Sequence, residues 1–335
     1  MITLSDVIAA NARIRPYLRP TPLLHSEPLS RLAGRPVHLK LDCWQVTGSF
    51  KPRGAFNYCL QLSEADRRRG LVTSSAGNHG QGAGLACRQL GIRLSVVVPD
   101  SAPRAKKSGM RDLGVALIEV SGGYEAAHAT ALQLAAERGV RYVPAYDDEQ
   151  IMAGQGTVAL EAVSDLGGAA DFLVPVGGGG LMAGVGTAAK GIEPASRLIG
   201  VQSELTDAMH RALKAGHVVH IEDLPTLCDG LAGDIEPINL TYGQRLLDAM
   251  LLVSERAVAR AVVFLLREHR LLVEGSGAVG VAALLDEAVR PQVLAGLGQA
   301  ARPVVIVLSG RNIDADRLAG LLGDPANTYF KEAQQ

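Results

Sequence analysis

The sequence predicts an α/β protein with open, mostly parallel sheets flanked by helices, and three observations lead to that prediction. Short apolar runs alternate with segments of helical period along most of the chain. Several of these runs are almost uninterrupted Val, Leu and Ile, which is typical of strands buried on both faces of a parallel sheet. Glycine or Pro/Asp/Ser clusters separate the units, as expected for turns. The 335 residues are enough for about two domains.

In chain order, the expected strands lie at 94–99, 115–120, 172–176, 197–201 and 304–308. Helical spacing follows the first two strands, at 103–113 and at 124–139. In two further units the strand leads into a helix through an unusual loop: LVTS continues through residues 74–82, and FLVPV continues through four glycines. No Pro- or Ser-rich linker marks a boundary, so we expect the chain to cross between its domains more than once.

Composition narrows the class of protein. The net charge is −1, whereas a nucleic-acid or acidic-membrane partner needs a basic surplus. The longest uncharged stretch, 172–189, contains six glycines and a proline and indicates strand, turn and helix rather than a membrane span. The N-terminus lacks the basic start and apolar run of a signal peptide. Four scattered cysteines favour a reduced, cytoplasmic protein over a disulfide-linked one.

The first candidate for chemistry is the segment TGSFKPRGA, residues 47–55. Ser49 is a plausible cap for a helix whose first turn contains Pro52, which places Lys51 at a helix N-terminus. The positive end of the helix and burial would both lower the pKa of this amine. A neutral amine is what Schiff-base chemistry requires. For a lone lysine, a solvated surface side chain remains the commoner interpretation.

Two glycine-bearing loops are candidates for anion binding. Residues 74–82, SSAGNHGQG, expose many backbone N–H groups at a helix N-terminus and suit a carboxylate, although an ordinary strand–helix turn is equally expected. The run GGGG, residues 177–180, lets the backbone approach a phosphate. A dinucleotide fold is the rival interpretation, supported by Glu204 near the end of the next strand. The G-x-G-x-x-G spacing fails at Ala183, so a single phosphate monoester is favoured.

A fourth loop, LSGRNID at 308–314, follows the last expected strand. Ser309 lies where that strand ends, and its hydroxyl could face a bound ring. The alternative is a serine that caps a short helix.

Together these motifs resemble a known family. SFKPRGA, SAGNHGQG, GGGG and SGRN occur here in one order, as in the fold-type II pyridoxal-phosphate enzymes of the threonine/serine dehydratase and serine racemase branch. GQGT at 154–157 and EGSGAVGVAALL at 274–285 are similar to the same branch, and the resemblance runs from about residue 5 to 322. It implies a tryptophan-synthase-β-like fold and a homodimer. It also implies a large domain made of 1–41 and 144–335, with a small domain of 42–143 inserted in it.

The resemblance also implies roles for individual residues. Lys51 would hold pyridoxal phosphate covalently, Phe50 would pack against the cofactor ring, and Asn78 would bind its 3′-oxygen. The phosphate would lie on the glycine loop, Ser309 would face the pyridine nitrogen, and Glu274 would lie near the ring. The residues expected to receive the amino-acid substrate, mainly its carboxylate, are Ser75, Ala76, Gly77, Asn78, His79 and Thr157. The four residues of the glycine loop are Gly177, Gly178, Gly179 and Gly180.

The implied activity is that of a lyase. It would convert a β-hydroxy amino acid such as L-threonine or L-serine to a 2-oxo acid and ammonia. Racemases of the branch carry a serine where this chain has Ala76, which disfavours racemisation here. Part of the branch binds a divalent cation, but the corresponding positions are Gln202 and Ala208, neither of which is a carboxylate. Glu204 and Asp207 lie nearby, so a shifted register stays open, but we expect no tightly bound metal.

Other interpretations stay open. The stretch 225–243, the SGRNID loop and Trp44 resemble the hydroxyectoine-utilisation dehydratase subgroup, which would mean an ectoine derivative or a bulky 3-hydroxy amino acid as substrate. A serine or other amino-acid racemase is a further alternative. From a different class, an NAD-dependent oxidoreductase would use the GGGG unit, and a binding protein without activity could have kept the fold.

Overall fold

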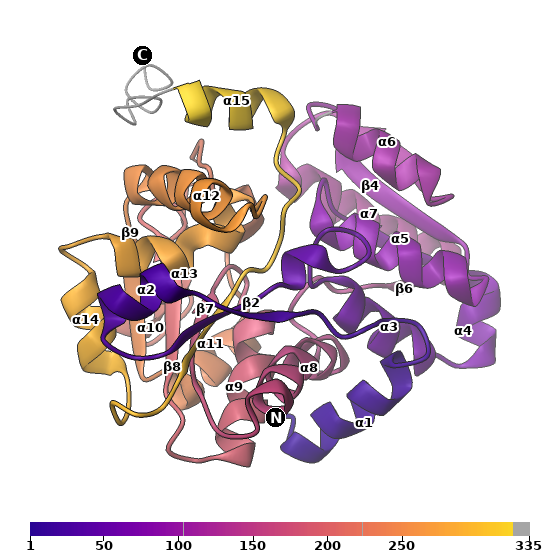
Figure 1. The fold of residues 1–335 in the computed structure, drawn as a ribbon. Helices are drawn as coiled ribbons and strands as arrows, with labels where there is room; N and C mark the ends of the chain where they lie inside the picture. Colours follow the sequence, from indigo (N-terminus) through magenta and orange to yellow (C-terminus); the bar gives the residue numbers. More distant parts are fainter. Residues whose placement is uncertain (103, 223, 324–335) are drawn as a thin grey trace.

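The computed structural model describes residues 1–102, 104–222 and 224–323, and it contains two β-sheets that lie side by side (Figure 1). The larger sheet has six strands in the order β1-β2-β10-β7-β8-β9. Its strands are β1 (Leu23–His25), β2 (Val37–Lys40), β10 (Val304–Val307), β7 (Asp171–Pro175), β8 (Leu198–Ser203) and β9 (Ala249–Val253). Only the pair β1–β2 within this sheet is antiparallel.

The smaller sheet has four strands in the order β5-β4-β3-β6, and all its pairs are parallel. Its strands are β5 (Ala116–Val120), β4 (Leu94–Pro99), β3 (Leu71–Ser74) and β6 (Arg141–Tyr142). The prediction of an α/β fold with two open, mostly parallel sheets is therefore confirmed.

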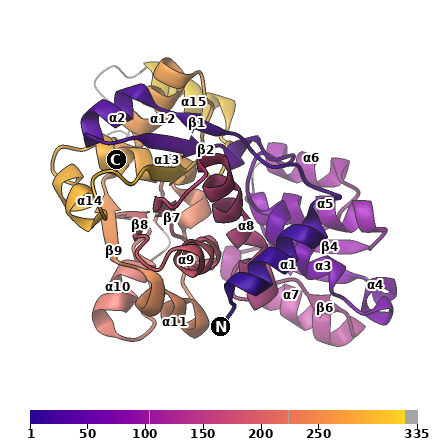
Figure 2. The same cartoon turned by 60° about the horizontal axis from the view of Figure 1, so that its bottom comes forward.

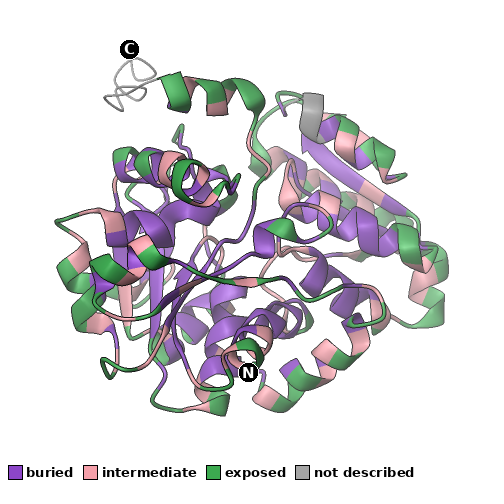
Figure 3. Ribbon diagram, in the orientation of Figure 1, coloured by how far each residue is buried: buried purple, intermediate pink, exposed green. Residues whose placement is uncertain are grey.

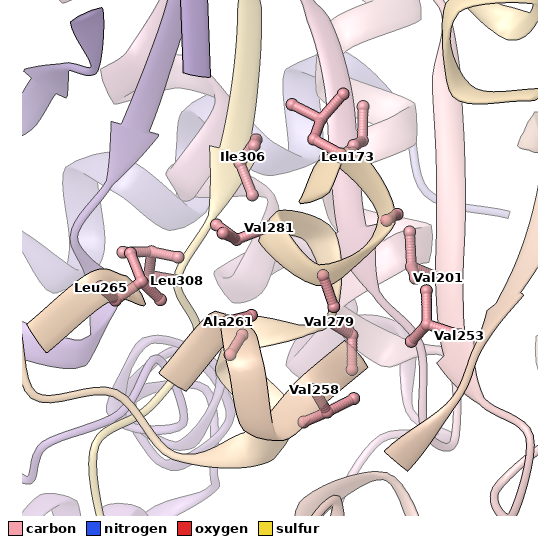
Figure 4. Close-up of a cluster of buried hydrophobic side chains, with 14 of the residues drawn as sticks. Leu173, Val201, Val253, Val258, Ala261, Leu265, Val279, Val281, Ile306 and Leu308 are labelled. Atoms are coloured by element: carbon pink, nitrogen blue, oxygen red, sulfur yellow. The ribbon is translucent and has the colours of Figure 1, made fainter. Parts of the chain in front are cut away.

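Side chains of the larger sheet alternate between two cores, because successive residues of a strand point to opposite faces. In β10, Val304 and Ile306 enter one core, whereas Val305 and Val307 enter the other. Figure 4 shows the first core, where residues of α12 and α13 pack onto the strands. That face is covered by α2 (Glu27–Ala33), α12 (Glu255–His269), α13 (Gly275–Leu285) and α14 (Arg290–Gly296). The other face is covered by α1 (Leu4–Ile14), α8 (Glu149–Leu166), α9 (Gly180–Ile192), α10 (Ala208–Ala215) and α11 (Pro237–Leu246).

The smaller sheet is also covered on both faces. One core joins the sheet to α3 (Pro52–Leu60), α5 (Asn78–Leu90) and α6 (Arg104–Asp112), and the other joins it to α7 (Tyr124–Arg138). The remaining elements are α4 (Glu64–Arg69), α15 (Ala315–Gly323) and the 3-10 helices η1 (Asp42–Trp44) and η2 (Asp229–Leu231). Helix α8 packs against both α3 and α9, and it lies between the two sheets (Figure 2). Figure 3 shows the buried strands and the exposed outer surfaces of the helices.

The expected strands match the observed ones closely, and three of the apolar runs are buried along their whole length as β7, β8 and β10. The run at 115–120 differs, because β5 is the edge of its sheet and is largely exposed or half-buried. All strands of the smaller sheet come from residues 71–142. The domain boundaries at 41 and 144 stay a prediction.

Two further observations concern membrane-spanning helices and the state of the cysteines. Among the described helices, none is both long enough and apolar enough to cross a bilayer. Cys43, Cys59, Cys87 and Cys228 are free thiols with buried side chains.

Candidate active site

The lysine loop is held against the loop that follows β10. Ser49 pairs with Gly310 as an isolated β-bridge, and the backbone N–H of Phe50 donates to the carbonyl of Ser309 at 3.0 Å. Helix α3 then begins at Pro52, with Lys51 at its N-cap position. The expectation that Ser49 caps this helix is wrong, because Ser49 lies in extended pairing and its buried hydroxyl has no partner among the described residues.

The amine of Lys51 lies between an aromatic ring and a backbone carbonyl. Nζ is 5.3 Å from the centre of the Phe50 ring and donates to the carbonyl oxygen of Ala145 at 3.0 Å. Burial lowers the pKa of Lys51 to about 8, while the charge of Asp147 acts in the opposite direction. A measurable fraction of this amine is therefore neutral near neutral pH, as the sequence predicted for position 51.

The segment after Ala145 connects the lysine to the glycine loop. Tyr146 covers that loop so closely that a Cβ on Gly178 would come within 2.4 Å of its ring. The Tyr146 carbonyl accepts a hydrogen bond from Asn239 Nδ2 at 3.2 Å, and its hydroxyl donates to the Asp234 carbonyl at 3.3 Å. Position 178 must be glycine, because any side chain there would displace the Tyr146 ring.

The glycine loop opens helix α9 as the sequence predicted. Gly179 is the N-cap residue in a left-handed conformation (φ +93°), and no side chain caps the helix. The first N–H groups of α9 therefore point out of the helix without a side-chain acceptor. Together with the helix dipole, they form a site suited to a phosphate.

Residues 75–77 lie beyond the carboxyl end of β3 and lead into α5, which begins at Asn78. Asn78 Nδ2 donates to Glu274 Oε1 at 2.8 Å, and Asn78 Oδ1 accepts from Asn312 Nδ2 at 2.6 Å. These contacts join α5, the start of α13 and the loop after β10. Ser309, in that last loop, is buried, and its hydroxyl makes no hydrogen bond within the described residues.

His79 is buried beneath the same loop. Its Nε2 is 3.0 Å from Thr73 Oγ1 and 3.3 Å from the carbonyl oxygen of Val143. Burial, with a smaller effect from Lys51, lowers the pKa of His79 to about 3. This imidazole is therefore neutral at physiological pH. Because Thr73 Oγ1 itself donates to Val143, Nε2 is the protonated nitrogen of the ring.

Comparison with known proteins identifies the family. The profile described as "Pyridoxal-phosphate dependent enzyme" matches residues 14–310. The chain belongs to this family. It is 39% identical over 320 residues to the L-threonine ammonia-lyase of Thermotoga maritima, covering 95% of this chain and 77% of that protein. It is 35% identical over 325 residues to the catabolic L-threonine dehydratase TdcB of Escherichia coli, covering 96% of both.

Solved structures agree in fold over almost the whole chain. Maize serine racemase superposes with a TM-score of 0.90 at 27% identity, covering 99% of both chains. Threonine deaminase isoform 2 of Solanum lycopersicum superposes with a TM-score of 0.88 at 31% identity, covering 95% of this chain and 86% of the other. The cofactor is pyridoxal phosphate, so the nicotinamide interpretation of the GGGG unit is set aside.

The residues present fit this cofactor. The glycine loop offers an uncapped helix N-terminus for the phosphate. Lys51 offers a half-buried amine with a lowered pKa, and Ser309 offers a buried hydroxyl that makes no hydrogen bond within the described residues. We propose that these residues hold the cofactor, together with Phe50 and Asn78. Glu274 reaches the site through its hydrogen bond to Asn78.

Two of the side chains predicted to contact the substrate already make hydrogen bonds within the protein. Ser75 Oγ accepts from the N–H groups of Gly77 and Gly80 at 3.1 and 3.0 Å, so it supports the turn into α5. Thr157 is fully buried; its hydroxyl accepts from Arg53 and donates to the Gly154 carbonyl. The assignment of both to the substrate stays a prediction, and the contacts found are structural.

The backbone N–H groups of Asn78 and His79 have no acceptor among the described residues. The predicted carboxylate site would use these two groups, and it stays a prediction. Ala76 and Gly77 complete the turn before them.

Three residues that lie at the site were not predicted from the sequence. Tyr146 and Asp147 follow β6, and Asn312 lies in the SGRNID loop. Each one comes after the carboxyl end of a parallel strand, which is the signal that could have identified it. For the metal prediction, the described residues contain no cluster of three or more potential ligands, and Gln202 accepts from the N–H of His210.

Proposed function

We propose that the protein is a pyridoxal-phosphate-dependent ammonia-lyase that converts a β-hydroxy amino acid, such as L-threonine or L-serine, to a 2-oxo acid and ammonia. The observation that carries this proposal is the Lys51 amine, placed beside Phe50 and one peptide carbonyl with a pKa of about 8. Relatives named for threonine deamination, at 35–39% identity over nearly the whole chain, support it.

The bound cofactor would supply an aldehyde and an electron sink, which makes the Cα proton of an amino acid acidic. The protein would then have to bind the substrate and move that proton. With a pKa of about 8, roughly a tenth of the Lys51 amine is neutral at pH 7. Lys51 Nζ can therefore both receive the cofactor and take a proton, which an ordinary lysine with its pKa of 10.5 would do far less readily.

The opposite side of the site argues for elimination rather than racemisation. A racemase needs a second group to return the proton to the other face of Cα. Position 76, where the racemases of this branch carry serine, has an alanine that packs against the core of the smaller sheet. The methyl group cannot donate a proton. We therefore assign the proton chemistry to Lys51 alone.

A substrate panel tests the proposed function. Purified holoenzyme is incubated with L-threonine, L-serine, threo-3-hydroxyaspartate, phenylserine and a hydroxyectoine-derived amino acid, and 2-oxo acid and ammonia are assayed separately. We expect both products in equal amounts from at least one L-substrate. Formation of the D-enantiomer without 2-oxo acid would contradict the proposal. The same panel determines which side chain is preferred.

We also propose that the protein acts in the cytoplasm as a homodimer with two domains that close on the substrate. The four buried thiols are compatible with a reducing compartment. Light scattering of the purified holoenzyme tests the dimer, because a monomeric mass at micromolar concentration would exclude it.

A further inference from the structure

Asn312 contacts three parts of the candidate site at once. Its side-chain Nδ2 donates to the carbonyl of Thr47 at 2.9 Å and to Asn78 Oδ1 at 2.6 Å. Its backbone N–H donates to Glu274 Oε2 at 3.0 Å. One residue thus links the start of the lysine loop, the start of α5 and the start of α13. Nothing in the predicted chemistry requires this residue to touch the substrate or the cofactor.

The orientation of the Asn78 amide follows from the groups around it. A side-chain amide can be turned by 180°, which exchanges its oxygen and its nitrogen. The carbonyl of Thr47 only accepts, so the atom of Asn312 that faces it must be Nδ2. This Nδ2 also faces Asn78, which must therefore present its oxygen.

The other end of the Asn78 amide gives the same answer. Glu274 receives the Asn312 backbone N–H on Oε2 and uses Oε1 to accept from Asn78. Asn78 must therefore present its nitrogen to Glu274. Two independent partners, one a donor and one an acceptor, select the same orientation of the amide.

In this orientation Asn78 keeps one N–H for another acceptor. The amide nitrogen carries two hydrogens, and Glu274 takes one of them. Asn78 is partly exposed at the start of α5, so the second hydrogen is not confined to the interior. If the amide were turned over, an oxygen would replace this N–H and would repel an anionic acceptor such as the 3′-oxygen of the cofactor.

We propose that Asn312 is a positioning residue: it holds the Asn78 amide so that its nitrogen faces the cofactor, and it fixes the lysine loop to the same point through Thr47. This inference rests on the proposed contact between Asn78 and the cofactor. Asn312 acts through Asn78 and does not itself touch the reacting atoms.

The test compares Asn312→Ala, Asn312→Asp, Asn78→Ala and the double variant Asn78→Ala/Asn312→Ala. Asp314→Ala is the matched control, because this residue lies in the same loop and its exposed side chain has no hydrogen bond within the described residues. Three measurements are made on each holoenzyme: the visible absorbance spectrum of the cofactor as a function of pH, the dissociation constant of pyridoxal phosphate by fluorescence, and steady-state kinetics, which give kcat and KM.

We expect Asn312→Ala to change the ratio of the cofactor absorption bands and to lower kcat about ten-fold, as for the loss of one strong hydrogen bond. Asn312→Asp should be more severe, because its carboxylate cannot donate and would turn the Asn78 amide over. The double variant should match Asn78→Ala alone, since Asn312 has nothing left to orient. Asp314→Ala should match the wild type in all three measurements.

Three results would overturn the inference. An unchanged spectrum and unchanged kcat in Asn312→Asp would show that no orientation is imposed. Additive losses in the double variant would show that Asn312 acts independently of Asn78. A wild-type spectrum in Asn78→Ala would show that Asn78 makes no contact with the cofactor. It would not contradict the proposed lyase activity. If Asn312→Ala does not fold, the isosteric Asn312→Asp variant and its double with Asn78→Ala give the same comparison.

Discussion

Two polar centres lie two residues apart in the chain, at Arg53 and at Lys51. They differ in how fully their polar groups are hydrogen-bonded within the protein. The guanidinium of Arg53 is buried and donates to both oxygens of Asp42, to both oxygens of Glu161 and to the hydroxyls of Thr21 and Thr157. Lys40 adds a second cation, 2.7 Å from Glu161. The two cations balance the two carboxylates, and within the described residues none of these buried side chains is left without a hydrogen-bond partner.

The Lys51 centre is open. Its amine has one carbonyl partner, the hydroxyl of Ser309 makes no hydrogen bond in the described part of the chain, and the glycine loop opens a helix without a side-chain cap. Buried polar groups are normally satisfied within the protein. The difference therefore teaches that the closed centre holds the first turn of α3 in place, whereas the open centre has polar atoms available for the proposed contacts with the cofactor.

The largest effect is expected from removing the amine of the open centre. Lys51→Ala should reduce turnover by more than about a thousand-fold, because it removes the group that we propose receives the cofactor and moves the proton. The fold should survive, since among the described residues Nζ makes a hydrogen bond only to the Ala145 carbonyl. Activity assays with the best substrate and thermal unfolding of the cofactor-free protein measure the two effects. Full activity in this variant would contradict the mechanism.

Removing the cation of the closed centre should act on stability instead. Arg53→Ala leaves Asp42 and Glu161 buried without their main partner, and breaking such an ion pair costs about 3–5 kcal/mol. Urea unfolding of the cofactor-free protein measures this loss. Arg53→Lys serves as the comparison, because it keeps the charge but cannot bind both carboxylates through two nitrogens each. A stable Arg53→Ala variant would show that the network does not hold α3.

Acid should affect the closed centre in a defined pH range. Although burial raises the pKa of Glu161, the hydrogen bonds and charge of Arg53 and Lys40 lower it to about 2, from an ordinary 4.5. The unfolded chain therefore takes up this proton at a higher pH than the folded protein does. The resulting stabilisation is complete above about pH 4.5 and is lost as the pH falls towards 2. Glu161→Gln should flatten the unfolding free energy across that range, and an unchanged pH profile would contradict the assignment.

The smallest effect concerns the charge beside the open centre. Asp147 opposes the lowering of the Lys51 pKa, so Asp147→Asn should move the midpoint below about 8. The amine of the cofactor-free protein then becomes reactive at lower pH. The rate of covalent capture of pyridoxal phosphate, followed by absorbance as a function of pH, measures this midpoint. The control is Glu125→Gln, an exposed side chain in α7. Equal midpoints in the two variants would show that Asp147 has no special role.

Much of the fold could be predicted from the sequence, because buried parallel strands leave a strong local signal. The runs at 172–176 and 304–308 became β7 and β10 almost residue for residue. The edge strand β5 has the same apolar pattern but lies at the border of its sheet. Whether a strand is central or at an edge depends on which strands pair with it. That pairing depends on residues far apart in the sequence, so it cannot be predicted from the residues of the strand alone.

The site was predictable where a motif has a local reason. The glycine loop and Lys51 lie at helix starts, and the sequence shows both features. The contacts of Thr157 and Asn312 depend on residues more than a hundred positions away, Arg53 and Asn78 respectively. Thr157 was expected at the substrate, although the structure shows it bound to Arg53. The GQGT motif that contains it brings α8 against α3: a Cβ on Gly154 would lie 2.5 Å from the Arg53 carbonyl oxygen.

The most direct test of the central claim is to locate the covalently bound cofactor. The purified holoenzyme is treated with borohydride, digested, and analysed by mass spectrometry with fragmentation. We expect the added mass of reduced pyridoxal phosphate on the peptide that contains Lys51, and on that residue within it. The modification at Lys40 or at any other lysine, with Lys51 unmodified, would contradict the account.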